Sequence, residues 1–175
     1  MLVVNLFAPP GSGKSTMAAH IFAKLKWANV NCELVIEFAK DLTWENRQNT
    51  LENQLYVFAE QHHRVNRLKK QVDVVITDSP LVLSIIYNNK YCNNNFKHLN
   101  SLVLEQHFKF NNYNIFINRK KPYNPIGRNQ TEEEANKIGI EIKELLDSYY
   151  IKYAEFDGVE ESVDIIVNKI LEQLQ

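Results

Sequence analysis

The sequence predicts an α/β domain in which helices cover both faces of a five-stranded parallel sheet. Two observations lead to this fold class. Short apolar runs alternate along the chain with stretches whose apolar residues recur at helical spacing, which is typical of strands connected by helices. The length of 175 residues and the hydrophobic content of 45% suit one compact domain, so we expect residues 1–175 to form a single unit.

Apolar runs place the first three strands. Residues 2–7 form a run that ends before Pro9, and a helix is expected over 14–27. Residues 33–38 follow as the second strand. Residues 72–77 are mostly β-branched and apolar, which indicates a third strand buried on both faces. Between these two strands, apolar residues at helical spacing predict one long helix that starts near 51 and ends near 70.

The second half of the chain begins with an asparagine-rich segment. Residues 88–100 contain six asparagines and no apolar period, so a loop or an irregular crossover is expected. Thr131 and Glu134 have the spacing of a capping box, which predicts the start of a helix. The remaining elements are expected to be a helix, a strand, a polar loop, a helix, a strand and a helix at 96–110, 113–117, 118–130, 131–146, 151–156 and 159–174.

Charge and hydropathy restrict the partners and the location. Twenty basic and twenty-one acidic side chains give a net charge of −1, whereas a protein held on duplex DNA by its overall charge would be far more basic. The opening apolar run lacks the features of a signal peptide, and no run approaches the roughly 18 apolar residues of a membrane helix. Cys32 and Cys92 are expected to be reduced thiols. These features predict a cytoplasmic protein with no membrane partner.

A glycine-rich loop between the first strand and its helix carries the strongest motif. The segment Ala8–Ser15 reads APPGSGKS, the position and spacing of a Walker A loop, whose backbone N–H groups and helix N-terminus cradle phosphates. Lys14 would contact the β- and γ-phosphates of ATP or another nucleoside triphosphate, and the Ser15 hydroxyl would bind Mg²⁺. The usual leading glycine is Ala8, which fits if φ is not positive there. The residues assigned to the nucleotide are Pro10, Gly11, Ser12, Gly13, Lys14, Ser15 and Thr16.

The alternative, a chance glycine-rich turn, would not bring strand, lysine, hydroxyl and helix into register. Other classes that use this loop lack their second motif here. An Asn-Lys-x-Asp motif for guanine is absent, as is the Leu-Ser-Gly-Gly signature of ABC ATPases. The helical lid domain of AAA+ motors is not expected in 175 residues. A small phosphotransferase remains.

Two acidic residues follow strands at the edge where parallel sheets bind ligands. Asp78 ends the third strand and could hold the Mg²⁺ shell as a Walker B carboxylate, or it could cap the helix after Pro80. Glu37 could accept a proton from a hydroxyl of the acceptor as a general base, or it could pair with Lys40 or Arg47.

In order and spacing, these motifs resemble the small P-loop kinases of the nucleoside and nucleotide kinase superfamily. The branch most resembled contains the ribosylnicotinamide-kinase domain and related phage-encoded kinases. The shared elements are the loop at 8–15, Glu37-Phe38-Ala39-Lys40, Asp78-Ser79-Pro80, Arg119, the segment 123–128 and the helix that begins at Thr131. The resemblance implies a P-loop NTPase three-layer sandwich with strand order 2-3-1-4-5 and a lid-like loop at about 118–130. Ser79-Pro80 departs from the ribosylnicotinamide kinases, so the acceptor stays open.

The resemblance also implies roles for basic residues. Arg119 and Arg128 match lid arginines that neutralise charge on the transferred phosphoryl group, the alternative being a solvated basic loop. Gln61 and Arg64 could line an acceptor cleft from the long helix, although a polar helix face explains their spacing equally well.

The combined prediction is a kinase that uses Mg²⁺ and ATP, or another nucleoside triphosphate, to phosphorylate a hydroxyl of a nucleoside- or nucleotide-type acceptor. Two acceptor classes compete: a free nucleoside or nucleotide, and a hydroxylated base within DNA such as 5-hydroxymethyluracil, which some phage kinases that resemble this chain phosphorylate. The alternatives are a nucleoside monophosphate kinase and a non-catalytic nucleotide-binding regulatory module. A homodimer is allowed, and a phage-encoded enzyme would act in the host cytoplasm.

Overall fold

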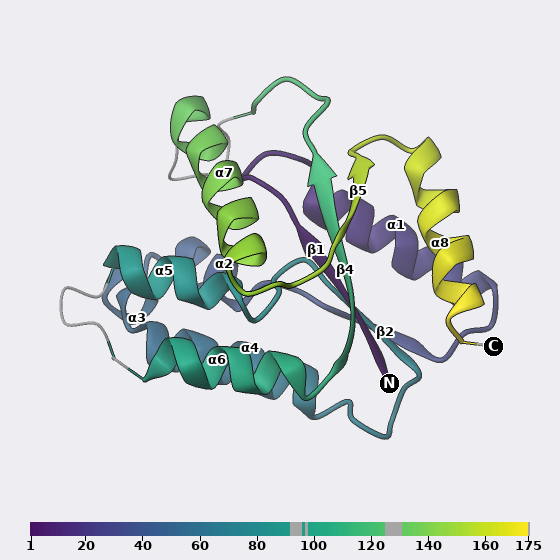
Figure 1. Ribbon diagram of the computed structural model, residues 1–175, viewed down its shortest axis with the longest axis horizontal. Helices are drawn as coiled ribbons and strands as arrows, with labels where there is room; N and C mark the ends of the chain where they lie inside the picture. Colours follow the sequence, from purple (N-terminus) through teal and green to yellow (C-terminus); the bar gives the residue numbers. More distant parts are fainter. Residues whose placement is uncertain (92–95, 97, 125–130, 175) are drawn as a thin grey trace.

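A computed structural model describes residues 1–91, 96, 98–124 and 131–174 (Figure 1). Its strands form one parallel sheet in the order β2-β3-β1-β4-β5, which confirms both the fold class and the strand order expected from the sequence. The strands are β1 (Leu2–Phe7), β2 (Cys32–Val35), β3 (Val74–Thr77), β4 (Asn111–Asn118) and β5 (Ala154–Asp157).

Helices cover both faces of this sheet, giving three layers (Figure 1). The helices are α1 (Lys14–Trp27), α2 (Phe38–Trp44), α3 (Gln48–Glu52), α4 (Gln54–Asn66), α5 (Leu83–Tyr91), α6 (Leu99–Phe108), α7 (Glu132–Ser148) and α8 (Glu161–Glu172). One face packs against α1 and α8, and the other packs against α4, α5, α6 and α7. The helices α2 and α3 pack on α4 beside the sheet.

The central strand β1 shows why this layering follows from the sequence. All six of its residues are buried. Leu2, Val4 and Leu6 pack against α1 and α8, whereas Val3 and Phe7 pack against the helices of the opposite layer. Because alternate side chains of a strand point to opposite faces, a strand between two helical layers needs apolar residues on both faces, and five of the six residues of β1 are apolar.

One polar residue interrupts β1. The Asn5 amide donates hydrogen bonds to Asn112 Oδ1 at 2.9 Å and to Asn114 Oδ1 at 3.0 Å, and Asn114 lies directly opposite Asn5 in the parallel register. Asn114 in turn donates to the Lys152 carbonyl at 3.1 Å. This cluster satisfies its buried amides internally and favours the observed alignment of β1 and β4 over a shifted one.

Several element boundaries differ from the sequence prediction. The strand β2 ends at Val35, and Phe38 begins α2 instead of ending the strand. The predicted long helix is divided into α3 and α4 at Asn53, whose side chain accepts from the Tyr56 N–H and caps α4. The helix α6 begins at Leu99, and β5 begins at Ala154.

The asparagine-rich segment is also partly helical. Its residues 88–91 belong to α5, so the prediction of a loop there is wrong. Asn88 is buried and donates to Asn100 Oδ1 at 2.9 Å, which links α5 to α6. Residues 92–95 and 97 lie outside the described residues, and Cys92 is among them. At residues 88–91, a helix that contacts α6 therefore stands where an irregular chain was expected.

The capping box at the start of α7 is confirmed. The Thr131 N–H donates to Glu134 Oε2 at 2.7 Å, and the Glu134 N–H donates to Thr131 Oγ1 at 3.2 Å. This reciprocal pair satisfies two N–H groups that a helix start leaves without partners. It also sets where α7 begins after the basic loop.

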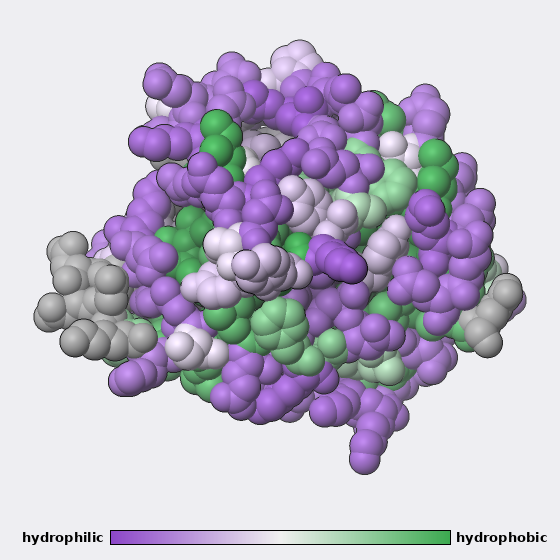
Figure 2. Space-filling model, viewed as in Figure 1, coloured by the Kyte–Doolittle hydropathy of each residue, from purple (hydrophilic) through white to green (hydrophobic). Residues whose placement is uncertain are grey.

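The surface carries few large apolar areas on the face in Figure 2, where apolar side chains form small patches among hydrophilic ones. Cys32 is a buried free thiol. Within the described ranges, none of the helices combines the length and apolarity that a membrane crossing requires.

Candidate nucleotide-binding site

The loop between β1 and α1 adopts a conformation that depends on its glycines. Gly11 has a φ of 83° and Gly13 a φ of 85°, the left-handed region that favours glycine. Ala8 is buried and is not among the residues with positive φ, so alanine meets the condition set by the sequence analysis. The local sequence thus specifies the turn that leads from β1 into α1.

The same turn leaves the start of α1 open to an anion. Gly13 occupies the N-cap position without a side-chain cap, so no side chain of that residue covers the first N–H groups of the helix. A Cβ atom built on Gly13 would meet nothing within 4 Å. Backbone N–H groups and the positive end of a helix facing open space form an arrangement that suits phosphate.

Ser15 on α1 and Asp78 after β3 lie together behind this loop. The Ser15 hydroxyl donates to Asp78 Oδ2 at 2.6 Å, and Asp78 is only 3% exposed. Asp78 Oδ1 is buried and has no hydrogen-bond partner among the described residues. The helix α5 begins at Leu83, so Asp78 does not lie at its N-cap position, and the Ser79 N–H donates to Thr77 Oγ1 instead of to Asp78.

This pair fits a divalent cation. Mg²⁺ prefers oxygen ligands and is usually held by one or two protein groups together with phosphate and water. A hydroxyl beside a buried carboxylate with one unpartnered oxygen supplies such a donor set. Within the described ranges there is no group of three or more His, Cys, Asp or Glu residues that would form an all-protein metal cage.

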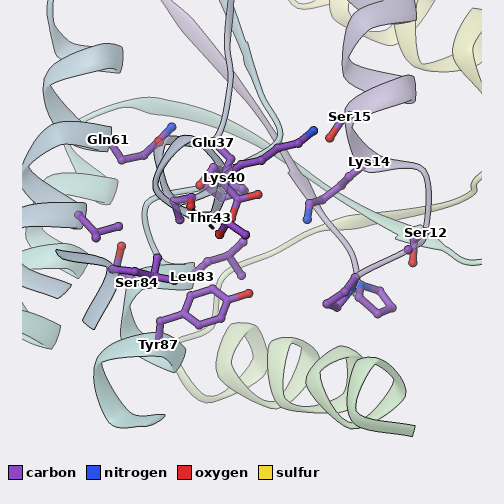
Figure 3. Close-up of a pocket in the computed structure, with 18 of the residues that line it drawn as sticks. Ser12, Lys14, Ser15, Glu37, Lys40, Thr43, Gln61, Leu83, Ser84 and Tyr87 are labelled. Atoms are coloured by element: carbon purple, nitrogen blue, oxygen red, sulfur yellow. Dashed lines mark hydrogen bonds between the residues drawn. The ribbon is translucent and has the colours of Figure 1, made fainter. Parts of the chain in front are cut away.

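A cavity of about 420 Å³ extends from the phosphate loop to the opposite helices (Figure 3). Its walls come from the loop, α2, α3, α4 and α5. Among the predicted site residues, those that line it are Pro10, Gly11, Ser12, Gly13, Lys14, Ser15, Thr16, Glu37 and Gln61. Lys14 points from the loop into the cavity (Figure 3). The sequence predicted residues from three separate segments that the fold brings to one space.

Glu37 enters the cavity from the turn between β2 and α2. Gln61 on α4 is 4% exposed, and its amide holds both sides of that turn: Oε1 accepts from the Phe38 N–H at 2.9 Å, and Nε2 donates to the Ile36 carbonyl at 3.4 Å. The Gln61 side chain therefore binds the backbone on either side of Glu37.

Tyr87 on α5 faces the cavity from the side opposite the loop (Figure 3). Its ring stacks on that of Tyr91, with a centroid distance of 6.1 Å and an interplanar angle of 7°. Burial, followed by the nearby charge of Glu37, raises the pKa of the Tyr87 phenol well above its ordinary value. The phenol thus keeps its proton and can donate a hydrogen bond to a ligand at neutral pH.

Two of the predicted arginines, Arg64 and Arg119, do not line the cavity. Arg64 donates to Asp41 Oδ2 on α2 at 2.9 Å and to Glu60 Oε1 on α4 at 3.3 Å. None of these three residues lines the cavity. The Arg64 guanidinium also lies 4.9 Å from the centre of the Phe38 ring. Arg64 therefore ties α2 to α4 instead of lining the predicted acceptor cleft.

Arg119 follows β4 and is bound to α7. Its Nη2 donates to Glu132 Oε1 at 2.8 Å and to Asn136 Oδ1 at 2.7 Å, and its guanidinium lies 5.4 Å from the centre of the Tyr123 ring. Nη1 is buried and has no hydrogen-bond partner in the described part of the chain. Arg128 lies outside the described residues.

Several residues that line the cavity were not predicted as site residues from the sequence. Their positions are Lys40, Thr43 and Trp44 on α2 and Ser84 and Tyr91 on α5. The position of Lys40 could have been predicted from the sequence, since it lies three residues after Glu37. Ser84 lies in the helix expected after Pro80 and Tyr91 lies in the asparagine-rich segment expected to be a loop, and no sequence pattern directed either residue to the cavity.

Comparisons with known proteins agree with this architecture. A family described as AAA domain matches residues 3–161, nearly the whole chain. No curated protein matches the sequence significantly. Among solved structures, the NadR protein in complex with NR is 15% identical with a TM-score of 0.71, and the alignment covers 94% of this chain and 50% of that one. This chain therefore spans about half the length of the NadR chain.

Two further structures align over nearly their full lengths. Thymidylate kinase from Ehrlichia chaffeensis is 14% identical with a TM-score of 0.60, covering 99% of this chain and 98% of that chain. Deoxyadenosine kinase from M. mycoides with bound dATP is 19% identical with a TM-score of 0.59, covering 97% and 99%. At these identities the likeness shows the fold. The chain belongs to the AAA domain family, and its fold is that of the P-loop nucleoside and nucleotide kinases.

Proposed function

We propose that this protein is a kinase that transfers the γ-phosphoryl group of ATP, or of another nucleoside triphosphate, to a hydroxyl of a nucleoside- or nucleotide-type acceptor. One observation carries the proposal: a single cavity joins the phosphate loop, with Lys14, to a carboxylate, Glu37, on the opposite side. A donor and an acceptor could thus meet in one cavity. The solved neighbours, which include a thymidylate kinase and a deoxyadenosine kinase, support this chemistry.

The donor would lie on the phosphate loop. The N–H groups at the start of α1 would bind its phosphate oxygens, and the Lys14 ammonium would bind the β- and γ-phosphates. Ser15 and Asp78 would hold Mg²⁺, which when bound neutralises phosphate charge. Because these groups are already positioned by β1, α1 and β3, little reorganisation is needed when the nucleotide arrives.

The acceptor would lie between the loop and α5. In the transfer step, the acceptor oxygen forms a bond to the γ-phosphorus while the bond between that phosphorus and the bridging oxygen of ADP breaks. The hydroxyl proton passes to the Glu37 carboxylate. Tyr87 keeps its proton and would donate a hydrogen bond to the acceptor, and Gln61 holds the turn that positions Glu37.

The segment 118–130 supplies the last part of the proposal. Arg119 and Arg128 would cover the charge that develops on the transferred phosphoryl group, with the segment acting as a lid. In the structure Arg119 is bound to Glu132 and Asn136, outside the cavity lining. This role therefore requires the guanidinium to exchange those partners for phosphate oxygens.

A radiolabelled γ-phosphate transfer screen tests the proposal. It would offer nucleosides, nucleoside monophosphates and DNA containing 5-hydroxymethyluracil, with MgATP as the donor. We expect hydroxyl acceptors to be phosphorylated, and Glu37→Gln to lower kcat by about 100-fold with donor binding unchanged, because the amide cannot receive a proton. Failure of every acceptor to stimulate ADP production, despite MgATP binding, would favour the non-catalytic regulatory module.

A second candidate, a nucleoside monophosphate kinase, is favoured by one observation. Lys40 lines the cavity together with Glu37, and an ammonium group there could bind an acceptor phosphate. The two candidates make opposite predictions for a matched pair of variants. For a hydroxyl acceptor, Glu37→Gln is the damaging change; for a monophosphate, Lys40→Gln raises the acceptor KM and Glu37→Gln has little effect.

Location and assembly follow from this proposal. A kinase of nucleosides or nucleotides would act in the cytoplasm, or in the host cytoplasm if the chain is phage-encoded. A hydroxylated base in DNA would need a basic groove beside the cavity, since the net charge of −1 gives little overall attraction to a duplex. Sedimentation of the purified protein would test the proposed homodimer.

A further inference from the structure

The chain contains five glycines, and each of the four that the structure describes lies in or against the phosphate loop. Gly11 and Gly13 belong to the loop and have positive φ. Gly139 lies in α7, and Gly158 lies between β5 and α8; neither has a positive φ. Gly127 lies outside the described residues. Backbone conformation therefore does not explain why residues 139 and 158 are glycines.

At position 139, close contact with Pro9 explains the glycine. A Cβ atom at this position would lie 3.0 Å from Pro9 Cγ and 3.2 Å from Pro9 Cβ, closer than ordinary van der Waals contact. Glycine is unfavourable within a helix relative to alanine, so its presence in the middle of α7 indicates a packing requirement. The proline ring is rigid and belongs to the chain entering the phosphate loop, so α7 packs directly against that loop.

Gly158 makes a second close approach, to backbone atoms. A Cβ atom there would lie 2.8 Å from the carbonyl oxygen of Ser12 and 3.1 Å from that of Asn118. The Gly158 N–H also donates to the Asn118 carbonyl at 2.8 Å. Backbone atoms cannot rotate away as a side chain can, so a larger residue would displace the loop or the turn itself.

We infer that Gly139 and Gly158 are positioning residues for the phosphate loop, and that their function is to let α7 and the β5–α8 turn hold the loop in its phosphate-binding conformation from two sides. The inference rests on the proposed nucleotide binding. A loop held in place before the ligand arrives loses less conformational freedom on binding, and its N–H groups are already aimed at the phosphates.

The contact also relates the loop to the proposed lid arginine. The helix that packs on Pro9 through Gly139 holds Arg119 through Glu132 and Asn136, near its N-terminus. One rigid element thus spans the phosphate loop and the first basic residue after β4. A displacement of α7 would change both the donor site and the Arg119 position.

Gly139→Ala tests the inference, with the dissociation constant of MgATP measured by calorimetry and the melting temperature of the free protein measured in parallel. We expect MgATP binding to weaken by roughly 10-fold, since displacing aligned groups by a fraction of an ångström is costly. The melting temperature should stay unchanged or rise, because alanine has the higher helix propensity. If Gly139 only stabilised the fold, Gly139→Ala would lower the melting temperature and leave the dissociation constant of MgATP unchanged.

A compensating variant makes the test specific. Pro9→Ala removes the ring atoms that the new Cβ would meet, so Pro9→Ala/Gly139→Ala should bind MgATP within about twofold of Pro9→Ala alone. Gly158→Ala should also weaken binding, but Pro9→Ala should not rescue it, because its neighbours are backbone atoms. Ile140→Ala, on the exposed side of α7, is the control and should bind as the wild type does.

The possible results separate this inference from the proposed function. If the wild-type protein binds no nucleoside triphosphate, the proposed function fails. If the wild type binds MgATP and Gly139→Ala binds it equally well, or if Pro9→Ala gives no rescue, the inference is overturned. If Gly139→Ala does not fold, the double variant is expected to fold and bind, and its failure to fold would overturn the inference as well.

Discussion

Replacing Asp78 by asparagine is expected to raise the free energy of unfolding of the ligand-free protein and to lower its affinity for MgATP. The carboxylate is 3% exposed, one oxygen accepts from Ser15 at 2.6 Å, and the other has no partner among the described residues. Such a group is costly in the free protein, because one oxygen of this buried carboxylate receives no hydrogen bond from the described residues. Bound Mg²⁺ would remove that cost, so the same residue should disfavour the free protein and favour the liganded one.

The magnitudes follow from these contacts. Leaving a buried acceptor without a partner costs about 1–3 kcal/mol, and more when it is charged, so the neutral Asp78→Asn variant should be about 1 kcal/mol more stable without metal and nucleotide. At a concentration of MgATP about 100 times the dissociation constant, the wild type should gain about 2.7 kcal/mol. Loss of a metal-binding carboxylate should weaken the affinity by roughly 100-fold and remove most of that gain.

Urea unfolding with EDTA, and again with saturating MgATP, measures both effects. The expected result is a reversal: the variant is the more stable protein in EDTA, and the wild type is the more stable one with MgATP. Asp73→Asn, before the opposite end of β3, is the matched control and should respond to MgATP as the wild type does. A variant destabilised by more than about 1 kcal/mol in EDTA would instead show that the hydrogen bond from Ser15 to the carboxylate outweighs the cost of burying it.

Three further predictions concern other parts of the fold. Lys14→Ala should lower phosphoryl transfer by roughly 10³-fold while the unfolding free energy changes by less than about 0.5 kcal/mol, since the side chain points into the cavity; near-normal turnover would contradict the phosphate-loop assignment. Asn5→Leu should lower the unfolding free energy by about 3 kcal/mol in urea, because it leaves the buried amide oxygen of Asn114 and the half-buried one of Asn112 without their donor, and a loss under about 1 kcal/mol would show that the cluster relaxes. Burial lowers the pKa of His107 from 6.5 to about 4, so the unfolded chain binds a proton first as the pH falls. Stability should therefore be complete above about pH 6.5 and fall by about 3 kcal/mol towards pH 4, a slope that His107→Gln should lack.

The sequence by itself determined the parts of the fold that depend on neighbouring residues. The predicted bounds of β1 and α1 agree with the structure, because an apolar run, a proline-glycine turn and an uncapped helix start are local features. The capping box at Thr131 was predictable for the same reason. So were the phosphate-loop residues, which are consecutive in the chain, and the side of the sheet on which Glu37 and Asp78 lie, since parallel strands end together.

Only the tertiary structure decided what depends on contacts between distant segments. The turn that carries Glu37 is held by Gln61, which lies 23 residues after Phe38, and Arg64 binds Asp41 on another helix instead of lining the cavity. Part of the asparagine-rich segment is helical, and its buried Asn88 donates to the half-buried Asn100 on α6, a contact that no local pattern reveals. Gly139 looks like a weak point in α7 until Pro9 is seen against it, 130 residues away in the chain. A buried amide or a missing Cβ has a meaning only through the atoms it meets, and folding brings those atoms together from separate parts of the sequence.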